Sequence, residues 1–397
     1  MNAKLERDAR AGMRPAIMKR ARFFAESIAE ICARSLVAPG RPLRWAVVAN
    51  ATAGGFALSR RWEARRAALA ECATLARQNP AREDCRPAAT AARLGAAPEL
   101  ASRGLVATER AGSGSVIAAA LAAEASAALE SAAGDATPFF LVIVAGGDGT
   151  SLEVLSVLFH APESLRANMA ILRLPMGTGN DGADSPDLAS TLGLLIRPSR
   201  VELAPALRLL TAPGGSLARK GPFLAFNILS VGLDAFVTHM TNKMKKKSPG
   251  DFYKLWVDIA ALLYDRLYTV GFLDVRALDE RGNEALSFRE KLLLIAVGAS
   301  GRRTYGSRKK ILPDDRNVCA LRQMPLLRKL ALKGPLAKGL HADQPEVRMF
   351  GAHRVEISGE HPILAQTDGE TVLLRREDFP AAIELTEPTI PVLRLAE

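Results

Sequence analysis

Short apolar runs alternate with helix-compatible segments through the first half of the chain. Four of these runs have the length of buried strands: residues 45–49, 105–107, 139–145 and 169–174. Residues 151–159 between the last two runs are typical of a helix. Because parallel strands are joined by crossover helices, this alternation predicts an α/β domain built on a parallel sheet.

The second half of the chain has a different pattern, in which β-like runs predominate. They cover residues 223–231, 270–277, 291–297, 355–358, 371–374 and 382–385, interrupted by one helical stretch at residues 252–267. We therefore expect an α/β domain at residues 44–195 and a β-rich domain at residues 196–397. Residues 1–43 are expected to form a basic extension. Its alternating Glu, Arg and Ala predict a solvated helix, with an amphipathic membrane-binding helix as the alternative.

Charge and composition narrow the class of partner but do not identify it. The formal net charge of +11 favours an anionic partner, which nucleic acid, an anionic lipid surface or phosphate would each satisfy. The four cysteines lack CxxC spacing and the five histidines form no H-x-x-x-H pair, so neither a disulfide framework nor a zinc site is indicated. The chain has neither an apolar run long enough to cross a bilayer nor a signal-peptide core. We therefore expect a cytoplasmic protein.

The strongest chemical signal is a glycine-rich turn between a predicted strand and a predicted helix, where residues 146–150 read GGDGT. Glycines let the backbone approach a bulky anion without interference from Cβ, and the N-terminus of the following helix offers unpaired N–H groups to phosphate. An acidic residue in such a loop is costly unless it holds a cation or accepts a proton. Asp148 is therefore a candidate for Mg²⁺ organisation or for a general base; the alternative is a tight turn capped by Asp.

A second glycine-rich loop follows the next predicted strand, where residues 175–181 read PMGTGND. Loops at the carboxyl ends of neighbouring parallel strands meet at one crevice, and open α/β sheets bind ligands there. Neither loop has the Gly-Lys-Ser/Thr ending of a P-loop, and Gly112-Ser113-Gly114 lacks the rest of a dinucleotide fingerprint. The two loops therefore indicate a phosphate-binding fold of another kind.

Together with Glu153, these loops resemble the diacylglycerol kinase catalytic family, which includes the sphingosine and ceramide kinases. The resemblance extends from about residue 44 to residue 385. Other similar features are Asn50 with Gly54-Gly55, Thr108, NILSVGLDAFV at residues 227–237, Gly250 with Tyr253, and DGE at residues 368–370. The resemblance implies a three-layer α/β/α domain, as in NAD kinases and phosphofructokinases, followed by a β-sandwich domain.

The resemblance also implies a function. We expect a lipid kinase that uses ATP and Mg²⁺ to phosphorylate the hydroxyl of a diacylglycerol-like or sphingoid lipid at a membrane surface. The residues expected to bind the nucleotide are Asn50, Gly54, Thr108, Gly146, Gly147, Gly149, Thr150, Glu153, Gly177, Thr178, Gly179 and Asn180. Asp148 is the first candidate for the base, Asp368 its rival, and Glu370 the candidate metal ligand. No nucleic-acid partner is expected and a homodimer fits the resemblance, but the sequence does not choose the acceptor lipid or distinguish ATP from CTP.

Two other functions stay open on the sequence. NAD kinases share GGDGT, but their second loop follows N-x-G-x-L-G-F-L, which differs from the P-x-GTGND of this chain. A catalytically inactive sensor of lipid or nucleotide is suggested by two departures from the family pattern. An expected Asp-Gly is missing after Pro313, where Asp314 or Asp315 would have to substitute, and residues 201–206 lack an expected Asp. Retention of the two candidate bases and Glu370 favours an active enzyme.

A basic run next to an apolar helix offers a candidate membrane-docking element. Lys243 and Lys245–Lys247 precede the predicted helix, whose apolar residues recur at helical spacing within residues 252–263. The alternative is a core-packed helix beside a solvated charge run, and apolar stripes at this spacing usually face a core.

Overall fold

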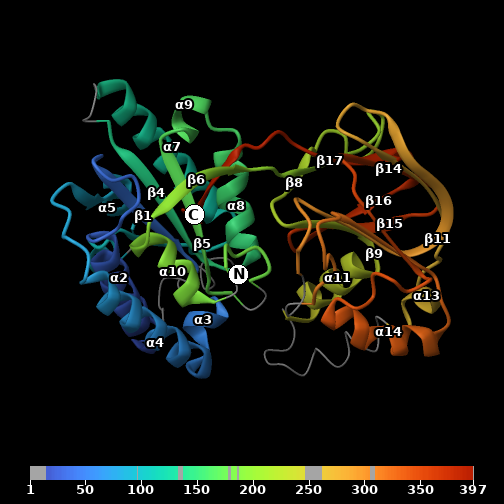
Figure 1. Ribbon diagram of the computed structural model, residues 1–397, viewed down its shortest axis with the longest axis horizontal. Helices are drawn as coiled ribbons and strands as arrows, with labels where there is room; N and C mark the ends of the chain where they lie inside the picture. Colours follow the sequence, from blue (N-terminus) through green and yellow to red (C-terminus); the bar gives the residue numbers. More distant parts are fainter. Residues whose placement is uncertain are drawn as a thin grey trace, which may run out of the picture. The chain divides into compact units, whose positions relative to one another are not determined.

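The computed structural model describes residues 15–95, 97–132, 137–177, 180–185, 187–245, 262–304 and 309–396. The chain divides into two compact units, shown in Figure 1. Unit 1 consists of Met1–Ala204 together with Thr389–Glu397, and unit 2 of Pro205–Pro388. These limits differ from the expected domains, because the division falls near residue 204 instead of 195 and the C-terminal residues return to the first unit.

Unit 1 is built on a seven-stranded sheet whose central strands are parallel. In sheet order the strands are β2 (Cys85–Pro87), β1 (Leu43–Ala49), β4 (Phe139–Gly146), β5 (Met169–Pro175), β18 (Ile390–Leu395) and β6 (Ser199–Ala204), with β3 (Leu105–Ala107) also paired to β1. The register places Ala49 beside both Ala107 and Ala145, and Gly146 beside Pro175. The loops that follow these four strands therefore begin side by side at one edge of the sheet.

Helices cover the sheet of unit 1 in two groups, which explains why its central strands are buried on both faces. One group contains α2 (Pro15–Cys32), α3 (Gly54–Ala57), α4 (Ser59–Ala76) and α10 (Leu188–Ile196); the other contains α5 (Ala89–Leu94), α7 (Ser113–Ser131), α8 (Asp148–Phe159) and α9 (Glu163–Arg166). The short α6 (Pro98–Ala101) packs against α5, α2 and β3. The expected three-layer α/β/α arrangement is confirmed.

Helix α2 is part of the core of unit 1, so the expectation of a solvated helix in the N-terminal extension is wrong. Phe24, Ile28 and Ile31 are fully buried and join the cluster that contains Trp45 and Val47 of β1. These three positions recur at helical spacing on one face, which outweighs the charged residues between them. Helix α2 of the extension therefore forms part of the hydrophobic core of unit 1.

Unit 2 is an eleven-stranded antiparallel sheet in the order β16-β15-β9-β11-β10-β14-β17-β7-β8, with β12 joining β11 to β13. Its strands are β7 (Leu207–Leu210), β8 (Phe223–Ala225), β9 (Ile228–Gly232), β10 (Phe272–Leu278), β11 (Glu284–Gly298), β12 (Val318–Arg322), β13 (Val347–Phe350), β14 (Arg354–Gly359), β15 (Ile363–Thr367), β16 (Glu370–Leu374) and β17 (Ala381–Leu385). The first half of β11 pairs with β10 and its second half with β9 and β12. One long strand thereby curls the sheet, and side chains from both halves share a core.

The order of an α/β domain followed by a β domain is confirmed, and the second domain, expected as a β-sandwich, has the form of a single curled antiparallel sheet. Its helices are α11 (Leu233–Lys245), α13 (Tyr264–Leu267) and α14 (Leu326–Lys338), with the 3₁₀ turn η2 (Arg376–Asp378). Helix α14 was not predicted, since Gly334 and Pro335 inside it lower its helix propensity. The predicted helix at 252–267 lies largely outside the described residues. Within the described part of the chain, the helices are too short or too polar to cross a membrane.

Candidate functional site

A pocket of about 270 Å³ lies in unit 1, at the edge of the sheet where β1, β3 and β4 end. Its lining is polar and comes from the loops after those strands and from the start of α8: Asn50, Thr52, Thr108, Glu109, Arg110, Ala111, Gly149, Thr150 and Glu153. Five of the residues expected to bind the nucleotide are in this set. The structure therefore brings together residues separated by up to a hundred positions in the sequence.

The loop after β1 is tied to the second glycine-rich loop. Asn50 Oδ1 accepts hydrogen bonds from Thr52 N–H at 3.0 Å and from the Thr52 hydroxyl at 2.8 Å, which fixes a tight turn. The Gly55 N–H donates to the Met176 carbonyl at 2.8 Å. A Cβ on Gly55 would lie 2.7 Å from that oxygen, so only glycine allows the approach. Gly54 begins α3 and lies outside the pocket lining.

The two glycine-rich loops touch each other through their backbones. A Cβ built on Gly177 would lie 2.4 Å from Gly147 Cα, and one on Gly146 would lie 2.7 Å from Thr150 Cβ. These glycines are needed for packing. Gly149 is different, because a Cβ there would meet no heavy atom within 4 Å. The open space at the N-terminus of α8 is therefore beside Gly149.

Asn180 closes the second glycine-rich loop on itself. Its side-chain Nδ2 donates to the Gly177 carbonyl at 3.0 Å, and its Oδ1 accepts the Gly177 N–H. Its φ of 61° lies in the left-handed region, which Asn tolerates. Thr178 and Gly179 lie outside the described residues.

Asp148 is the first residue of α8 and is half-buried. Its Oδ1 accepts the N–H of Gly182 at 3.0 Å, which connects α8 to the loop that follows β5. The positive end of the α8 dipole favours a carboxylate here. Asp148 is thus held on one oxygen at the point where the two glycine-rich loops meet.

Glu153 lines the pocket but already has backbone partners. Its carboxylate accepts the N–H of Gly112 at 2.7 Å and of Gly114 at 2.8 Å, which caps the N-terminus of α7. Gly112 has a φ of 85°, and a Cβ on Gly114 would lie 2.7 Å from the Glu153 Oε2 atom. The glycines of the segment Gly112–Gly114 are therefore explained by their contact with the Glu153 carboxylate. This contact fixes the position of the loop after β3.

Sequence reasoning missed Thr52, Glu109, Arg110 and Ala111 in the pocket lining. They flank Asn50 and Thr108, and that proximity was the available signal. Arg110 is exposed, and no ion pair of its guanidinium occurs among the residues that the structure describes. It adds a positive charge to a pocket that otherwise offers hydroxyl, amide and backbone groups together with the carboxylates of Glu109 and Glu153, the second of which is engaged in capping α7.

A buried ion pair beneath the second glycine-rich loop was also missed. The Arg173 guanidinium donates to Asp184 Oδ1 at 2.8 Å and 3.2 Å, and the Arg173 N–H donates to Asp184 Oδ2 at 2.6 Å. The side chains are only 7% and 0% exposed. This pair fastens the end of the loop back onto β5.

In unit 2, the DGE segment forms the turn of the hairpin between β15 and β16. Asp368 and Gly369 have φ values of 45° and 99°, and Thr367 pairs with Glu370 across the turn. An Asp-Gly pair with positive φ at both residues suits such two-residue turns. Part of this motif is therefore required by backbone geometry alone.

The Asp368 carboxylate binds the backbone before β9. Its Oδ1 accepts the N–H groups of Asn227 and Ile228, each at 3.1 Å, and its Oδ2 accepts the Phe226 N–H. Both oxygens are thus engaged by the main chain. Glu370, by contrast, is exposed at the end of the hairpin.

A buried polar group lies next to this turn. Asp234 Oδ2 accepts hydrogen bonds from the Ser230 hydroxyl at 2.6 Å and from Gln366 Nε2 at 3.2 Å. Burial raises the pKa of the Asp234 carboxyl, with Lys309 and the two hydrogen bonds opposing the rise. The Gln366 side chain also accepts the Gly369 N–H at 2.9 Å, so Gln366 connects the buried Asp234 carboxyl to the DGE turn.

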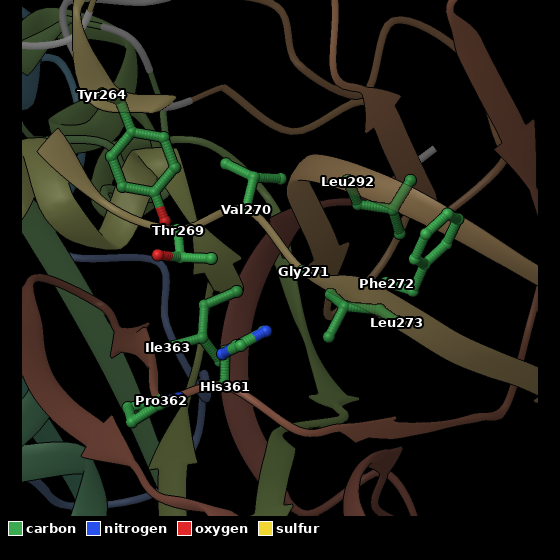
Figure 2. Close-up of a pocket in the computed structure, with 10 residues that line it drawn as sticks. All are labelled: Tyr264, Thr269, Val270, Gly271, Phe272, Leu273, Leu292, His361, Pro362 and Ile363. Carbon is green, nitrogen blue, oxygen red and sulfur yellow. The ribbon is translucent and has the colours of Figure 1, made fainter. Parts of the chain in front are cut away.

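Two hollows among the described residues of unit 2 differ in size. The larger one, about 390 Å³, combines apolar side chains with two cations and is lined by Ser216, Leu217, Lys220, Phe223, Thr371, Val372, Leu373 and Arg375. The crevice in Figure 2, where the His361 ring lies beside Gly271, has a volume of about 10 Å³. That space is about one water molecule, so it is too small for an organic ligand.

The residues that could hold a metal are few. Among the described residues, no cluster of three His, Cys, Asp or Glu side chains has the arrangement of a metal site. Asp314 and Asp315 are the residues that would have to substitute for the missing Asp-Gly. Asp314 forms an ion pair with Arg316 at 2.5 Å, and Asp315 forms one with Arg302 at 2.7 Å. Mg²⁺ in kinases uses one or two carboxylates and takes its other ligands from phosphate and water, so Asp148 alone in its loop fits that pattern.

Comparison with known proteins supplies the deciding observation. Residues 44–196 match the diacylglycerol kinase catalytic domain. The resemblance seen in the sequence is thereby confirmed, and the matched region contains the pocket and both glycine-rich loops.

One curated relative and several solved structures agree with this. The chain is 25% identical over 258 residues to a protein of Pectobacterium atrosepticum described as "Probable lipid kinase YegS-like", covering 62% of this chain and 78% of that one. A putative diacylglycerol kinase from Bacillus anthracis has the same fold, with a TM-score of 0.53 at 16% identity over 88% of this chain and 97% of that one. Another from the same organism gives a TM-score of 0.51 at 18% identity, covering 88% of this chain and 96% of that one.

Proposed function

We propose that the protein is a lipid kinase that transfers the γ-phosphate of ATP to the hydroxyl of a diacylglycerol-like or sphingoid lipid. The observation that carries this proposal is the pocket of unit 1. There, Asn50, Thr108, Gly149 and Thr150 converge at the N-terminus of α8, within the region that matches the catalytic domain. The similarity to a probable lipid kinase supports a lipid as the acceptor.

The pocket suits the phosphate end of a nucleotide. Its volume of about 270 Å³ is near the lower limit for ligand pockets, so it would take part of a nucleotide, with the remainder in solvent. The N–H groups at the start of α8 and the Arg110 guanidinium provide positive potential for phosphate. Glu153 already caps α7, so of these two helix N-termini only that of α8 is open to an anion.

We assign the general base to Asp148 and a structural role to Asp368. A base must have a free lone pair, and Asp148 uses one oxygen for the Gly182 N–H. Asp368 uses both oxygens to accept three backbone N–H groups, and protonation would weaken those bonds. In this assignment Asp148 takes the proton of the lipid hydroxyl as that oxygen attacks the γ-phosphorus, while the bond from the γ-phosphorus to the β,γ-bridging oxygen breaks and ADP leaves with its electron pair.

Mg²⁺ would neutralise negative charge on the triphosphate. Asp148 is the carboxylate in the glycine-rich loop that would hold it through phosphate and water. The role of Arg110 is to bind and orient the phosphates from the side of the pocket.

The proposal is tested by phosphoryl transfer from labelled ATP, with Mg²⁺, to a panel of lipids in mixed micelles. We expect label in a diacylglycerol or sphingoid lipid. Label in NAD, offered in parallel, would instead establish an NAD kinase. Nucleotide binding without transfer to either acceptor would support a catalytically inactive sensor.

Replacing Gly149 with Ala is expected to weaken ATP binding without lowering stability. The added methyl group meets no protein atom within 4 Å but occupies the space proposed for phosphate. Since Gly149 is inside α8, Ala should stabilise the fold by about 0.5–1 kcal/mol. Equilibrium binding of a non-hydrolysable ATP analogue should be about tenfold weaker, a loss of about 1.4 kcal/mol.

Gly177→Ala is the matched comparison, because its methyl group collides with Gly147. This variant should lose stability together with binding. Unchanged ATP affinity in a stable Gly149→Ala protein would contradict the placement of phosphate beside Gly149.

A further inference from the structure

Helix α14 of unit 2 exposes an apolar face. Leu327 is 79% exposed, Leu330 47% and Leu326 36%, and Leu340 just beyond the helix is 66% exposed. We call these four residues the leucine face. The exposed positions of the helix are Leu326, Leu327, Leu330, Ala331, Lys333, Gly334, Ala337 and Lys338. A surface helix normally exposes mainly charged and polar residues, whereas only two of these eight exposed positions, Lys333 and Lys338, are charged.

Contacts on the opposite side of α14 fix this orientation. Arg328 forms two hydrogen bonds of 2.7 Å with the Glu346 carboxylate, and Lys329 pairs with Asp265 of α13. Leu332 is buried in the cluster that includes Phe236 and Tyr264. Rotating the helix to hide its leucines would break both ion pairs, so the leucine face is built into unit 2.

The surroundings of the leucine face are basic. Residues 325–340 contain four Lys or Arg and no Asp or Glu, and two of the four, Arg328 and Lys329, are paired with carboxylates on the opposite side of the helix. Lys333 and Lys338 are exposed on the helix, and Lys310 lies against its C-terminal cap, where a Cβ on Gly339 would be 3.2 Å from the Lys310 Cβ. An apolar strip bordered by lysines is the pattern of helices that lie in the interface of an anionic bilayer.

We infer that the leucine face of α14 docks on the surface of an anionic lipid bilayer. The leucines would enter the boundary between headgroups and acyl chains, while the lysines reach the anionic headgroups. The choice of a bilayer as the occupant rests on the proposed lipid kinase function, since the acceptor lipid is located there. A second copy of the chain is a poorer occupant, because a symmetric contact would bring lysines against lysines. The docking element expected from the sequence, Lys243 and Lys245–Lys247 with the apolar helix at residues 252–263, lies largely outside the described residues.

Flotation of the full-length protein with vesicles tests the inference without catalysis. We expect binding to phosphatidylcholine vesicles that contain phosphatidylglycerol, much weaker binding to phosphatidylcholine alone, and loss of binding in high salt. The double substitution Leu327→Glu and Leu330→Glu should weaken binding to the anionic vesicles by at least about tenfold, because it removes apolar contact and adds repulsion. Leu203→Glu on β6 is the matched control, since Leu203 is 47% exposed like Leu330 but belongs to unit 1.

Absence of binding by the wild-type protein, or equal binding by the double variant, would overturn the inference. A wild-type dimer that the double variant converts to monomer, without vesicle binding, would assign the face to a second copy. Vesicle binding without any lipid phosphorylation would leave the docking surface in place and reject the kinase function. Phosphorylation of micellar lipid without vesicle binding would support the kinase function and reject the docking surface.

Discussion

Asp148→Asn should lower the rate of lipid phosphorylation by about 10²–10⁴-fold, the usual contribution of a general base, while ATP binding persists. The substituted amide keeps the same shape, and its oxygen can still accept the Gly182 N–H, so the junction between α8 and the loop after β5 is preserved. What is lost is the ability to take a proton. Initial rates with saturating ATP, together with analogue binding, separate these two effects.

Asp368→Asn is the informative comparison for the base. An amide can present only one acceptor oxygen to the three N–H groups of residues 226–228, so we expect reduced thermal stability of unit 2. If Asp368→Asn abolished phosphorylation in a fully stable protein while Asp148→Asn remained active, the assignment of the two carboxylates would be reversed.

Asp184→Asn should lower the free energy of unfolding by about 3–5 kcal/mol, because it removes the carboxylate charge that accepts two hydrogen bonds from the buried Arg173 guanidinium. The loss should appear in urea unfolding as a shift of the midpoint. Since Asp184 ends the loop that contains the second glycine-rich motif, ATP binding should weaken as well.

Two further variants interpret that result. Asp187 is the N-cap of α10, and its carboxylate accepts the Ser190 N–H at 2.8 Å. Asp187→Ala removes this cap and should lower the free energy of unfolding by only about 1 kcal/mol. Replacing both Arg173 and Asp184 with apolar residues should recover part of the stability, since the buried charge is then removed. A loss for Asp184→Asn no larger than that for Asp187→Ala would show that the ion pair contributes little.

Local patterns predicted the framework of the site well. The strands β3, β4 and β5 were placed to within one residue, because their apolar runs are bounded by glycine and proline. The glycine-rich loops follow those strands, so their meeting at one edge of the sheet could be deduced from the rules of parallel sheets. The match of residues 44–196 to the catalytic domain agrees with that deduction.

Contacts between distant residues could not be predicted in the same way. Nothing local to Glu153 indicates that it caps α7, because Gly112 and Gly114 lie some forty positions earlier. The partner of Asp184 is equally hidden in sequence. Helix α2 illustrates a related limit, since the pattern of its charges suggested a solvated helix while Phe24, Ile28 and Ile31 in fact complete a core.

The final strand gives unit 1 an unusual dependence on the whole chain. Strand β18 lies between β5 and β6, and β6 joins the sheet through it. During synthesis the ribosome must therefore release all of unit 2 before the first sheet can be completed. A gene fragment that ends at residue 204 would leave β6 without its neighbour in the sheet, whereas a circular permutant that connects residue 397 directly to the N-terminal segment would keep that strand.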